Sequence, residues 1–212
     1  MYEAPARRSA GSAYCKTTFA KQLADIEWWL RHVRARMPGL PVFLMGHSMG
    51  GGLALGFAAR AAAPSTQESI SLLSGIVATS PLLVQASPAP CPVRFIARLV
   101  GKAFPMLLVP TPVSSDTLTH DKAANEAAEK DPLCSQTVSL VALDSVLGGC
   151  GQVLLQGYKH WPRNLPLLIV HGTADKVTSD AASQEFFFKV EVQDKEFKPF
   201  EDAYHELANQ TE

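Results

Sequence analysis

PVFLMGHSMGG, residues 41–51, joins a continuous apolar run to a glycine-rich turn. The run at 41–45 is typical of a strand that is buried on both faces of a sheet. Small and apolar residues continue from Leu53 to Ala63 and predict a helix after the turn. Because strand, tight turn and helix in this order form the repeating unit of a parallel sheet, the stretch predicts an α/β fold.

Further segments extend this interpretation along the chain. Apolar residues recur at steps of three and four between residues 17 and 37, which places them on one face of a helix. Gly75–Thr79 and Leu165–Val170 are short apolar runs and predict two more buried strands. Lys195–Phe200 is more polar and suits a strand at the edge of the sheet. We therefore expect a mainly parallel sheet flanked by helices.

The segment between two of these strands is much longer than a crossover helix needs. Residues 82–161 contain helices punctuated by proline, so we expect a single domain, residues 1–212, with a helical cap inserted at about 82–161. The first helix of this cap, about Pro92–Phe104, has apolar residues on one side and arginine and lysine on another. Such a helix either binds a lipid surface or forms an ordinary solvated face, and both interpretations stay open.

Composition excludes several classes of protein. The 212 residues carry a formal net charge of -1 without a basic cluster, so we expect no nucleic-acid partner. No secretory leader or membrane-spanning run is recognisable, which predicts a cytoplasmic location with peripheral contact to membranes or lipid droplets. The cysteines lack the spacing of a metal site and are expected to be free thiols; they are Cys15, Cys91, Cys134 and Cys150.

The turn itself contains the pattern G-x-S-x-G, as Gly46-His47-Ser48-Met49-Gly50. In the nucleophile elbow of a hydrolase, a serine stands between a strand and a helix on a turn so tight that only glycine tolerates the close neighbours. Ser48 has this context and is the candidate nucleophile, with Gly46, His47 and Gly50 as its elbow. The start of the following helix favours a developing oxyanion, so the Met49 backbone N–H is the candidate oxyanion donor.

A serine nucleophile needs a histidine to accept its proton and a carboxylate to orient that histidine, here in the chain order serine, acid, histidine. Asp175 lies in the loop after the strand at 165–170 and is the candidate acid, with Asp180 as its rival. His205 follows the last predicted strand and is the candidate base. Position argues against the other histidines, of which His171 is interpreted as a structural residue; the remaining ones are His32, His47, His120 and His160.

Three motifs together resemble one family. GHSMGG at 46–51, HGTADKVT at 171–178 and AYHEL at 203–207 are similar to the monoglyceride lipase branch of the serine-aminopeptidase-like α/β hydrolases. The segment ADIEWWLR at 24–31 also resembles the helix before the nucleophile strand in that group, and the similarity extends from Thr17 onward.

The resemblance implies an α/β-hydrolase fold that hydrolyses monoacylglycerols to glycerol and fatty acid through an acyl-enzyme. The substrate would bind beneath a mobile apolar cap, and the reaction would use no metal or organic cofactor. By the match of motifs, Ser48 is the nucleophile, His205 the base and then the acid, and Asp175 the orienting carboxylate.

The sequence departs from this family at both ends. Relatives carry several strands before the first helix, including a His-Gly loop whose N–H is the second oxyanion donor, and no such loop stands upstream of Thr17. Only seven residues follow His205, fewer than the closing helix of the fold needs. We therefore expect a chain truncated at both ends, with its N-terminal strands missing and an exposed edge beside the nucleophile strand. A missing oxyanion donor costs roughly 10²–10³ in turnover.

Three functional hypotheses follow. The first is a serine ester hydrolase that acts on monoacylglycerols or lysophospholipids. The second is a peptidase or small-ester hydrolase of the same superfamily, for which Glu126 and Glu129 are the candidates to hold an amino terminus. The third is a catalytically inactive fragment that binds a lipid or a partner.

Overall fold

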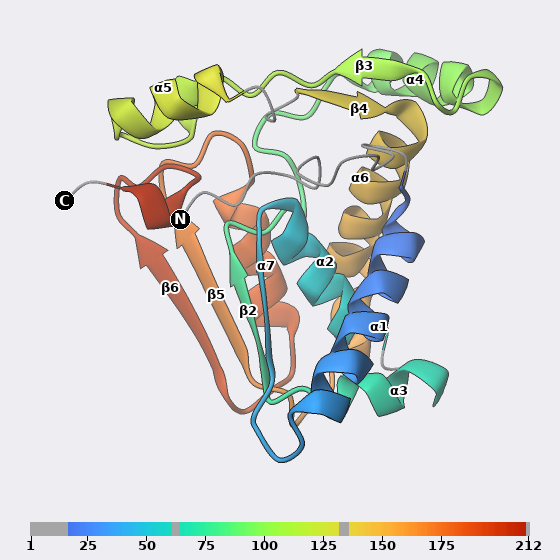
Figure 1. Ribbon diagram of the computed structural model, residues 1–212. Helices are drawn as coiled ribbons and strands as arrows, with labels where there is room; N and C mark the ends of the chain where they lie inside the picture. The colour runs from blue at the N-terminus through green and yellow to red at the C-terminus, as the bar shows by residue number, and fades with distance from the viewer. Residues whose placement is uncertain (1–16, 61–63, 132–135, 211–212) are drawn as a thin grey trace.

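The computed structural model describes residues 17–60, 64–131 and 136–210. Its centre is a four-stranded sheet with the order β1-β2-β5-β6, in which every neighbouring pair is parallel (Figure 1). The strands are β1 (Phe43–His47), β2 (Gly75–Thr79), β5 (Leu167–Gly172) and β6 (Lys195–Phe200).

The pairing register brings the carboxyl ends of the strands to one edge of the sheet. His47 lies opposite Thr79, and Thr79 lies opposite Val170. His171 lies opposite Pro199. The loops that follow β1, β5 and β6 therefore meet at the same end of the sheet, which is where open α/β sheets bind their ligands.

A layer of helices packs against one face of this sheet (Figure 1). Phe57 of α2 and Phe186 of α7 are fully buried with Ile76 and Ile169 of the sheet, and they form the centre of the core. Burying side chains of this size contributes roughly 1.5–3 kcal/mol each. The layer consists of α1 (Phe19–Arg36), α2 (Met49–Ala58), α6 (Leu140–Leu155) and α7 (Asp180–Lys189), with the short α3 (Pro64–Ile70) beside α1.

The opposite face of the sheet is open in the described ranges, where no helix packs on it (Figure 1). Phe43 and Met45 of β1 point to this face and are 60% and 66% exposed. The prediction that residues 41–45 are buried on both faces is therefore wrong, because β1 is an edge strand with helices on one face only. All-parallel sheets are usually covered on both faces, so this open face is unusual.

The predicted helices are present with shifted ends. The helix predicted at 17–37 is α1, and the Thr18 side chain caps it by accepting a hydrogen bond from the first turn. The helix predicted at Leu53–Ala63 begins earlier, at Met49, and ends at Ala58. It begins earlier because the glycines of the turn already adopt helical backbone angles, whereas apolar pattern alone placed the start at the first leucine.

The predicted strands are also present. The predictions at 75–79 and 195–200 are confirmed, and β6 does form an edge. The strands predicted at 41–45 and 165–170 each start and end two residues later, as β1 and β5. Proline has no N–H to give to a ladder, and each run has a proline within its first two residues, Pro41 and Pro166, so both starts stay outside the strands.

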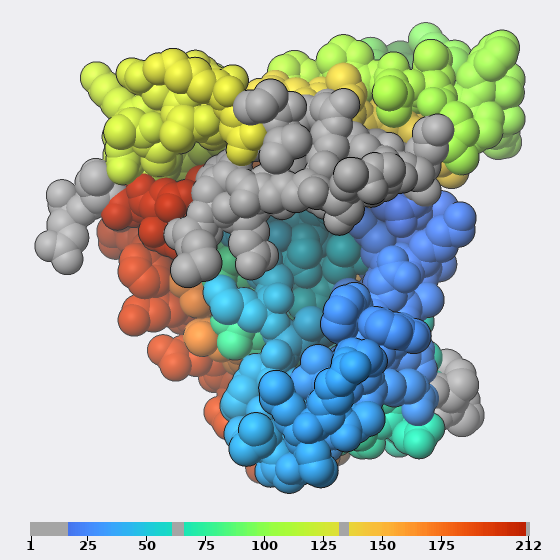
Figure 2. Space-filling view, in the orientation of Figure 1, coloured from blue at the N-terminus to red at the C-terminus, as the bar shows by residue number. Residues whose placement is uncertain are grey.

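The elements from α4 to β4, which lie between β2 and α6 in the chain, form an upper layer above the carboxyl ends of the strands (Figure 1, Figure 2). It includes an antiparallel pair, β3 with β4, that the sequence pattern did not predict. The assignment of residues 82–161 as a cap stays a prediction.

No helix in the described ranges has both the length and the apolar composition of a membrane span. The elements of this layer are α4 (Cys91–Ala103), β3 (Leu108–Pro110), η2 (Ser115–Thr117), α5 (Lys122–Lys130) and β4 (Thr137–Ser139); the turns η3 (Gly157–His160) and η4 (Leu207–Asn209) lie further along the chain.

Candidate active site

Ser48 connects β1 to α2 and has φ 53° and ψ -119°. A positive φ is strained for a residue that carries a side chain. The Ser48 N–H donates to the Thr79 carbonyl (2.9 Å), and the Ser48 carbonyl accepts from the N–H groups of Gly52 (3.0 Å) and Leu82 (2.8 Å). Backbone contacts with the end of β2 therefore hold the strained turn in place.

The close contacts of this turn fall on particular glycines. A Cβ at Gly46 would lie 2.1 Å from the Gly50 carbonyl oxygen, and a Cβ at Gly51 would lie 2.9 Å from the Cα of Pro81. A Cβ at Gly50 would meet nothing within 4 Å. The expectation that the turn requires glycine is thus confirmed for Gly46, whereas among the described residues no contact outside α2 requires a glycine at position 50.

Met49 is the first residue of α2. N–H groups in the first turn of a helix have no acceptor within the helix, and the helix dipole adds partial positive charge there. The Met49 N–H is therefore suited to bind an anionic oxygen beside Ser48. Its role as the oxyanion donor stays a prediction.

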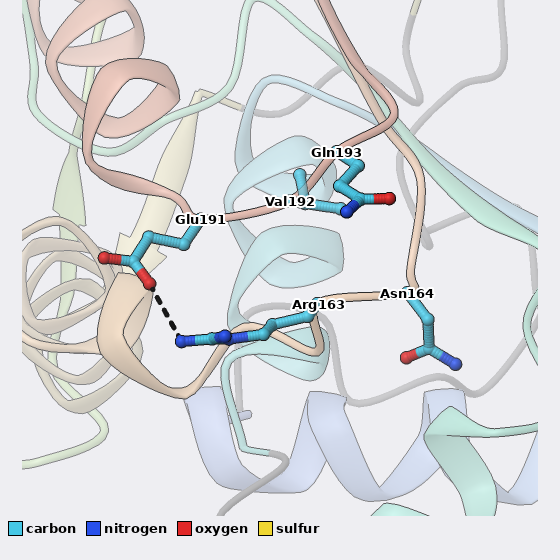
Figure 3. Close-up of a pocket in the computed structure, with 5 residues that line it drawn as sticks. All are labelled: Arg163, Asn164, Glu191, Val192 and Gln193. Atoms are coloured by element: carbon cyan, nitrogen blue, oxygen red, sulfur yellow. Dashed lines mark hydrogen bonds and ion pairs between the residues drawn. The ribbon is translucent and has the colours of Figure 1, made fainter.

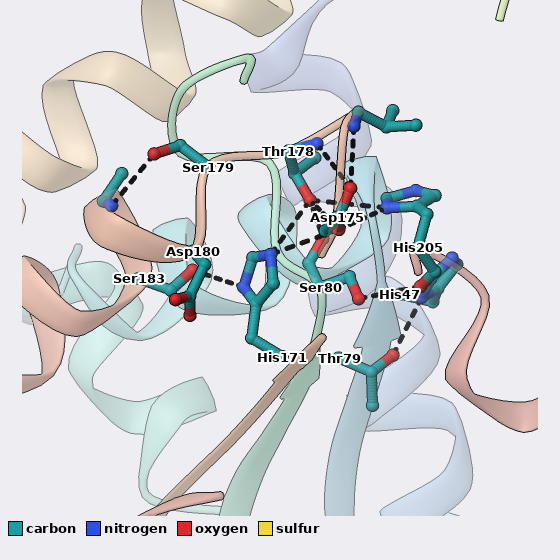
Figure 4. A network of polar contacts seen from close by, with 12 residues as sticks. His47, Thr79, Ser80, His171, Asp175, Thr178, Ser179, Asp180, Ser183 and His205 are labelled. Atoms are coloured by element: carbon teal, nitrogen blue, oxygen red, sulfur yellow. Dashed lines mark hydrogen bonds and ion pairs between the residues drawn. The ribbon is translucent and has the colours of Figure 1, made fainter. Parts of the chain in front are cut away.

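The Asp175 carboxylate is fully buried in the loop after β5 and accepts hydrogen bonds on both oxygens (Figure 4). Oδ1 accepts from the backbone N–H groups of Val177 (2.7 Å) and Thr178 (3.0 Å). Oδ2 lies 2.8 Å from His205 Nδ1, 2.8 Å from Thr178 Oγ1 and 3.2 Å from His171 Nε2. Burial by itself raises the pKa of Asp175, but the hydrogen bonds from His171 and His205 outweigh it and hold the pKa well below its ordinary range.

His205 lies in the loop after β6, and it is only 4% exposed. The Ser80 hydroxyl donates to the His205 carbonyl (2.8 Å). The loop also passes so close to β5 that a Cβ at Gly172 would lie 2.2 Å from the Ala203 carbonyl oxygen. Because Nδ1 faces Asp175, Nε2 is the ring nitrogen left for proton transfer.

His47 precedes Ser48 and brings the two parts of the site together. Its ring centroid lies 4.7 Å from that of His205, and its Nδ1 lies 3.0 Å from Thr79 Oγ1. Burial among its neighbours and the positive charge of a protonated His205 lower the pKa of His47 to about 4, although part of the residue faces solvent. In the described part of the chain, no hydrogen bond joins the Ser48 hydroxyl to the His205 ring. The structure thus joins Asp175 to His205 directly, and the residue before Ser48 lies next to the His205 ring.

The rival groups do not reach this site. Asp180 is the first residue of α7 and accepts a hydrogen bond from Gln184 Nε2 (2.8 Å).

Burial raises the pKa of the Cys150 thiol to about 12, which makes it a poor nucleophile. The prediction of free thiols is confirmed for Cys91 and Cys150, and the other two cysteines lie outside the described residues.

Sequence reasoning did not identify three residues that contact the candidate acid and base: His171, Thr178 and Ser80. The motif does place Thr178 three residues after Asp175, a spacing at which a hydroxyl can bond to a nearby carboxylate, and that was an available signal. Ser80 gave no signal, because its hydrogen bond to His205 spans 125 residues of sequence.

A cavity of about 620 Å³ lies at the other end of the sheet (Figure 3). Its lining residues precede β5 and β6, and two of them, Arg163 and Glu191, form an ion pair (3.3 Å). This is the amino end of the strands, so the cavity is separate from Asp175 and His205. Among the described residues, no group of three or more histidine, cysteine or acidic side chains is arranged to hold a metal ion.

The parallel sheet, the strained turn after β1 and the loops after β5 and β6 define an α/β-hydrolase fold. The crystal structure of Paleococcus ferrophilus monoacylglycerol lipase matches with a TM-score of 0.80 at 25% identity, over 92% of this chain and 70% of that one. This chain belongs to the serine aminopeptidase S33 family, whose model matches residues 8–212.

Relatives with longer chains show the same similarity. A monoacylglycerol lipase of Mycolicibacterium smegmatis is 29% identical over 180 residues, which are 82% of this chain and 59% of that protein. The monoglyceride lipase of Homo sapiens is 27% identical over 206 residues, which are 94% of this chain and 63% of that protein. The chain therefore spans less than two thirds of the length of these relatives.

Proposed function

We propose that this chain is a serine hydrolase that cleaves carboxylic esters, with Ser48, His205 and Asp175 as its catalytic triad. One arrangement carries the proposal: a fully buried carboxylate lies 2.8 Å from His205 Nδ1, and the His205 ring centroid lies 4.7 Å from that of His47, the residue before a serine on a strained strand-to-helix turn. A histidine oriented in this way presents Nε2 to the serine hydroxyl and activates a weak nucleophile. Membership in a family of serine hydrolases supports this assignment.

The first half of the reaction forms an acyl-enzyme. His205 Nε2 accepts the proton of the Ser48 hydroxyl while the serine oxygen bonds to the ester carbonyl carbon. The Asp175 carboxylate stabilises the imidazolium, and the Met49 N–H donates to the negatively charged carbonyl oxygen. The imidazolium then gives its proton to the alcohol oxygen as the carbon–oxygen bond breaks, and the alcohol leaves.

Water completes the cycle. His205 accepts a proton from a water molecule, whose oxygen bonds to the acyl carbon, and the Ser48 oxygen leaves with that proton as the fatty acid is released. The hydrogen bond between Ser48 and His205 forms once substrate is bound, because catalytic hydrogen bonds often tighten only in the complex. The proposed mechanism therefore requires a small movement of the Ser48 hydroxyl or of the His205 ring.

We propose a monoacylglycerol as the ester. The upper layer carries a group of apolar side chains that are all at least 48% exposed, which suits a substrate with one long acyl chain. These are Val93, Phe95, Ile96, Leu99, Phe104, Met106, Leu107 and Leu108. The proteins to which this chain is similar, named above as monoacylglycerol and monoglyceride lipases, support the same substrate class.

The acidic residues of α5 do not favour a peptidase. Glu126 forms an ion pair with Lys130 (3.0 Å), and Glu129 accepts a hydrogen bond from the Ser115 hydroxyl. Both carboxylates are exposed and bonded to their own neighbours. They do not form the enclosed anionic pocket that a substrate amino terminus needs.

We also propose that α4 rests on a lipid surface, with the chain located in the cytoplasm and bound peripherally to membranes or lipid droplets. No residue of α4 is buried, and Arg94 and Lys102 accompany its apolar side chains. Basic side chains near an anionic membrane contribute about 1 kcal/mol each to binding. The combination is typical of a helix that lies in the interface.

Labelling with a fluorophosphonate probe tests the hydrolase proposal, because the probe reacts only with an activated serine. We expect the wild-type chain to react and the Ser48→Ala variant to remain unlabelled, followed by wild-type turnover of long-chain monoacylglycerol. A folded wild-type chain that does not react would support the inactive-fragment hypothesis instead. Turnover of short activated esters alone would contradict the monoacylglycerol assignment and leave the esterase assignment standing.

A further inference from the structure

We propose that His171 is a positioning residue for the candidate triad: its ring and that of His205 bind the same carboxylate oxygen of Asp175. The inference rests on the proposed function and extends it, because it assigns to His171 an effect on the reaction rather than on folding alone. His171 does not reach Ser48 or the substrate position. It acts through Asp175.

The geometry around His171 leaves its ring one orientation. The side chain is fully buried at the end of β5. Nδ1 lies 2.9 Å from the Ser183 hydroxyl on α7, and Nε2 lies 3.2 Å from Asp175 Oδ2. The ring therefore connects α7 to the carboxylate (Figure 4).

The partners of each nitrogen assign the tautomer. An ionised carboxylate has no proton to give, so His171 Nε2 must carry the proton that lies between it and Asp175. Nδ1 then accepts a hydrogen bond from the Ser183 hydroxyl, which can rotate to donate. A neutral His171 satisfies both contacts, and burial of an extra charge is not required.

Thr178 contacts the same carboxylate oxygen as His171. Its hydroxyl lies 2.8 Å from Asp175 Oδ2 and 3.1 Å from the Ser80 carbonyl, but it has one proton for these two acceptors. His171 Nε2 lies 3.2 Å from Asp175 Oδ2 and 3.3 Å from Thr178 Oγ1, so its N–H is shared between these two oxygens. With His205 and Thr178, it is one of three side-chain groups that lie within 3.2 Å of Asp175 Oδ2.

Two imidazoles contact the carboxylate, and a third, that of His47, lies with its ring centroid 4.7 Å from that of His205. His171 comes from β5, His205 from the loop after β6, and His47 from β1, while Asp180 at the start of α7 is bonded to Gln184. Removing the His171 donor leaves more negative charge on Oδ2, so the Asp175–His205 pair gains affinity for a proton. It also frees the carboxylate to rotate away from His205.

The experiment compares His171→Leu and His171→Gln in the full chain with a matched control, His160→Gln, whose residue is exposed on η3. For His171→Leu we expect kcat for ester hydrolysis to fall roughly 10- to 100-fold, because a hydrogen bond to a charged group contributes a free energy of that size. We expect KM to stay unchanged. The acid limb of the kcat/KM profile moves to higher pH. His171→Gln, whose amide can donate, recovers part of kcat, and the control matches wild type.

A second readout does not depend on turnover. Histidine ring resonances followed by NMR against pH give the protonation midpoint of the Asp175–His205 pair, and this midpoint rises in His171→Leu. Unchanged kcat and an unchanged midpoint in a folded His171→Leu variant overturn the inference. A wild-type chain that fails to react with fluorophosphonate contradicts the proposed function, while the NMR midpoint still decides the role of His171.

If His171→Leu does not fold, Ser183→Ala takes its place. That variant keeps the His171 ring but removes the hydroxyl that holds it, so a smaller shift of the acid limb in the same direction supports the inference. A folded Ser183→Ala variant with a wild-type acid limb and a wild-type NMR midpoint counts against it.

Discussion

The two halves of the candidate site are held in different ways. Asp175 and His205 are held by side-chain and backbone contacts from Ser80 just after β2, from His171 in β5 and from Thr178 in the loop before α7. Ser48 is fixed by its backbone alone, at a strained φ, and its hydroxyl has no hydrogen bond to His205 in the described part of the chain. The acid–base half is thus assembled by long-range packing, whereas the nucleophile half is built by a local turn.

The two halves nevertheless share one requirement. A Cβ at Gly46 would meet the backbone oxygen of Gly50, and a Cβ at Gly172 would meet the backbone oxygens of Ala203 and Tyr204. Each half therefore depends on one close backbone approach that only glycine permits. Substitutions that act on one half and spare the other can separate their contributions.

The largest effect is expected at the acid–base half. Asp175→Asn removes the charge that stabilises the imidazolium and leaves the wrong tautomer of His205 facing the serine, so kcat should fall roughly 10⁴-fold. Steady-state ester hydrolysis measures this. Asp180→Asn, the rival acid, serves as the control and should keep wild-type kcat; a large loss there would reverse the assignment of the two carboxylates.

The second prediction compares alanine substitutions at two glycines of the same turn. Gly46→Ala places a Cβ against a backbone oxygen and should displace Ser48 enough to slow labelling by fluorophosphonate roughly 100-fold or more. Gly50→Ala meets nothing within 4 Å and should label at nearly the wild-type rate. Equal rates for the two variants would contradict the account of the elbow. Thermal melts check that both chains fold.

Stability should also depend on Asp175 in a pH-dependent way. Its pKa is lowered in the folded chain from an ordinary value of 3.8, so the stability that it contributes is present above that pH and is lost as the pH falls below it. The difference in unfolding free energy between wild type and Asp175→Asn should therefore shrink from pH 6 to pH 3. Urea titrations measure it, and a difference that grows toward acid pH would contradict the lowered pKa.

The smallest effect concerns the upper layer rather than the site. Phe95→Asp places a charge on the apolar side of α4 and should weaken binding to vesicles that contain anionic phospholipid by about tenfold, with no change in the labelling of Ser48. Phe188→Asp changes a ring on α7 that is 74% exposed, compared with 63% for Phe95, and is the control. Similar losses in both variants would show that α4 has no special affinity for lipid. Vesicle sedimentation gives the binding constants.

Local sequence pattern predicted most of the elements. Apolar runs located three strands of the parallel sheet, and the more polar run at 195–200 located the edge strand β6, because a βα unit leaves its signature within about fifteen residues. The sequence pattern wrongly predicted that β1 is buried on both faces, because the exposure of Phe43 and Met45 depends on which helices pack on that face. The β3–β4 pair was also missed, because three-residue strands carry too little pattern to distinguish them from loop.

The sequence by itself determined the βα turn at Ser48 and the order in which Ser48, Asp175 and His205 occur, because both depend on residues that are neighbours or on chain order alone. Only the tertiary structure decided that His205 bonds Asp175, that Ser80 and His171 support this pair, and that Gly46 rather than Gly50 bears the close contact. Those contacts join segments that are distant in sequence, and their geometry is set by how the strand ends pack together.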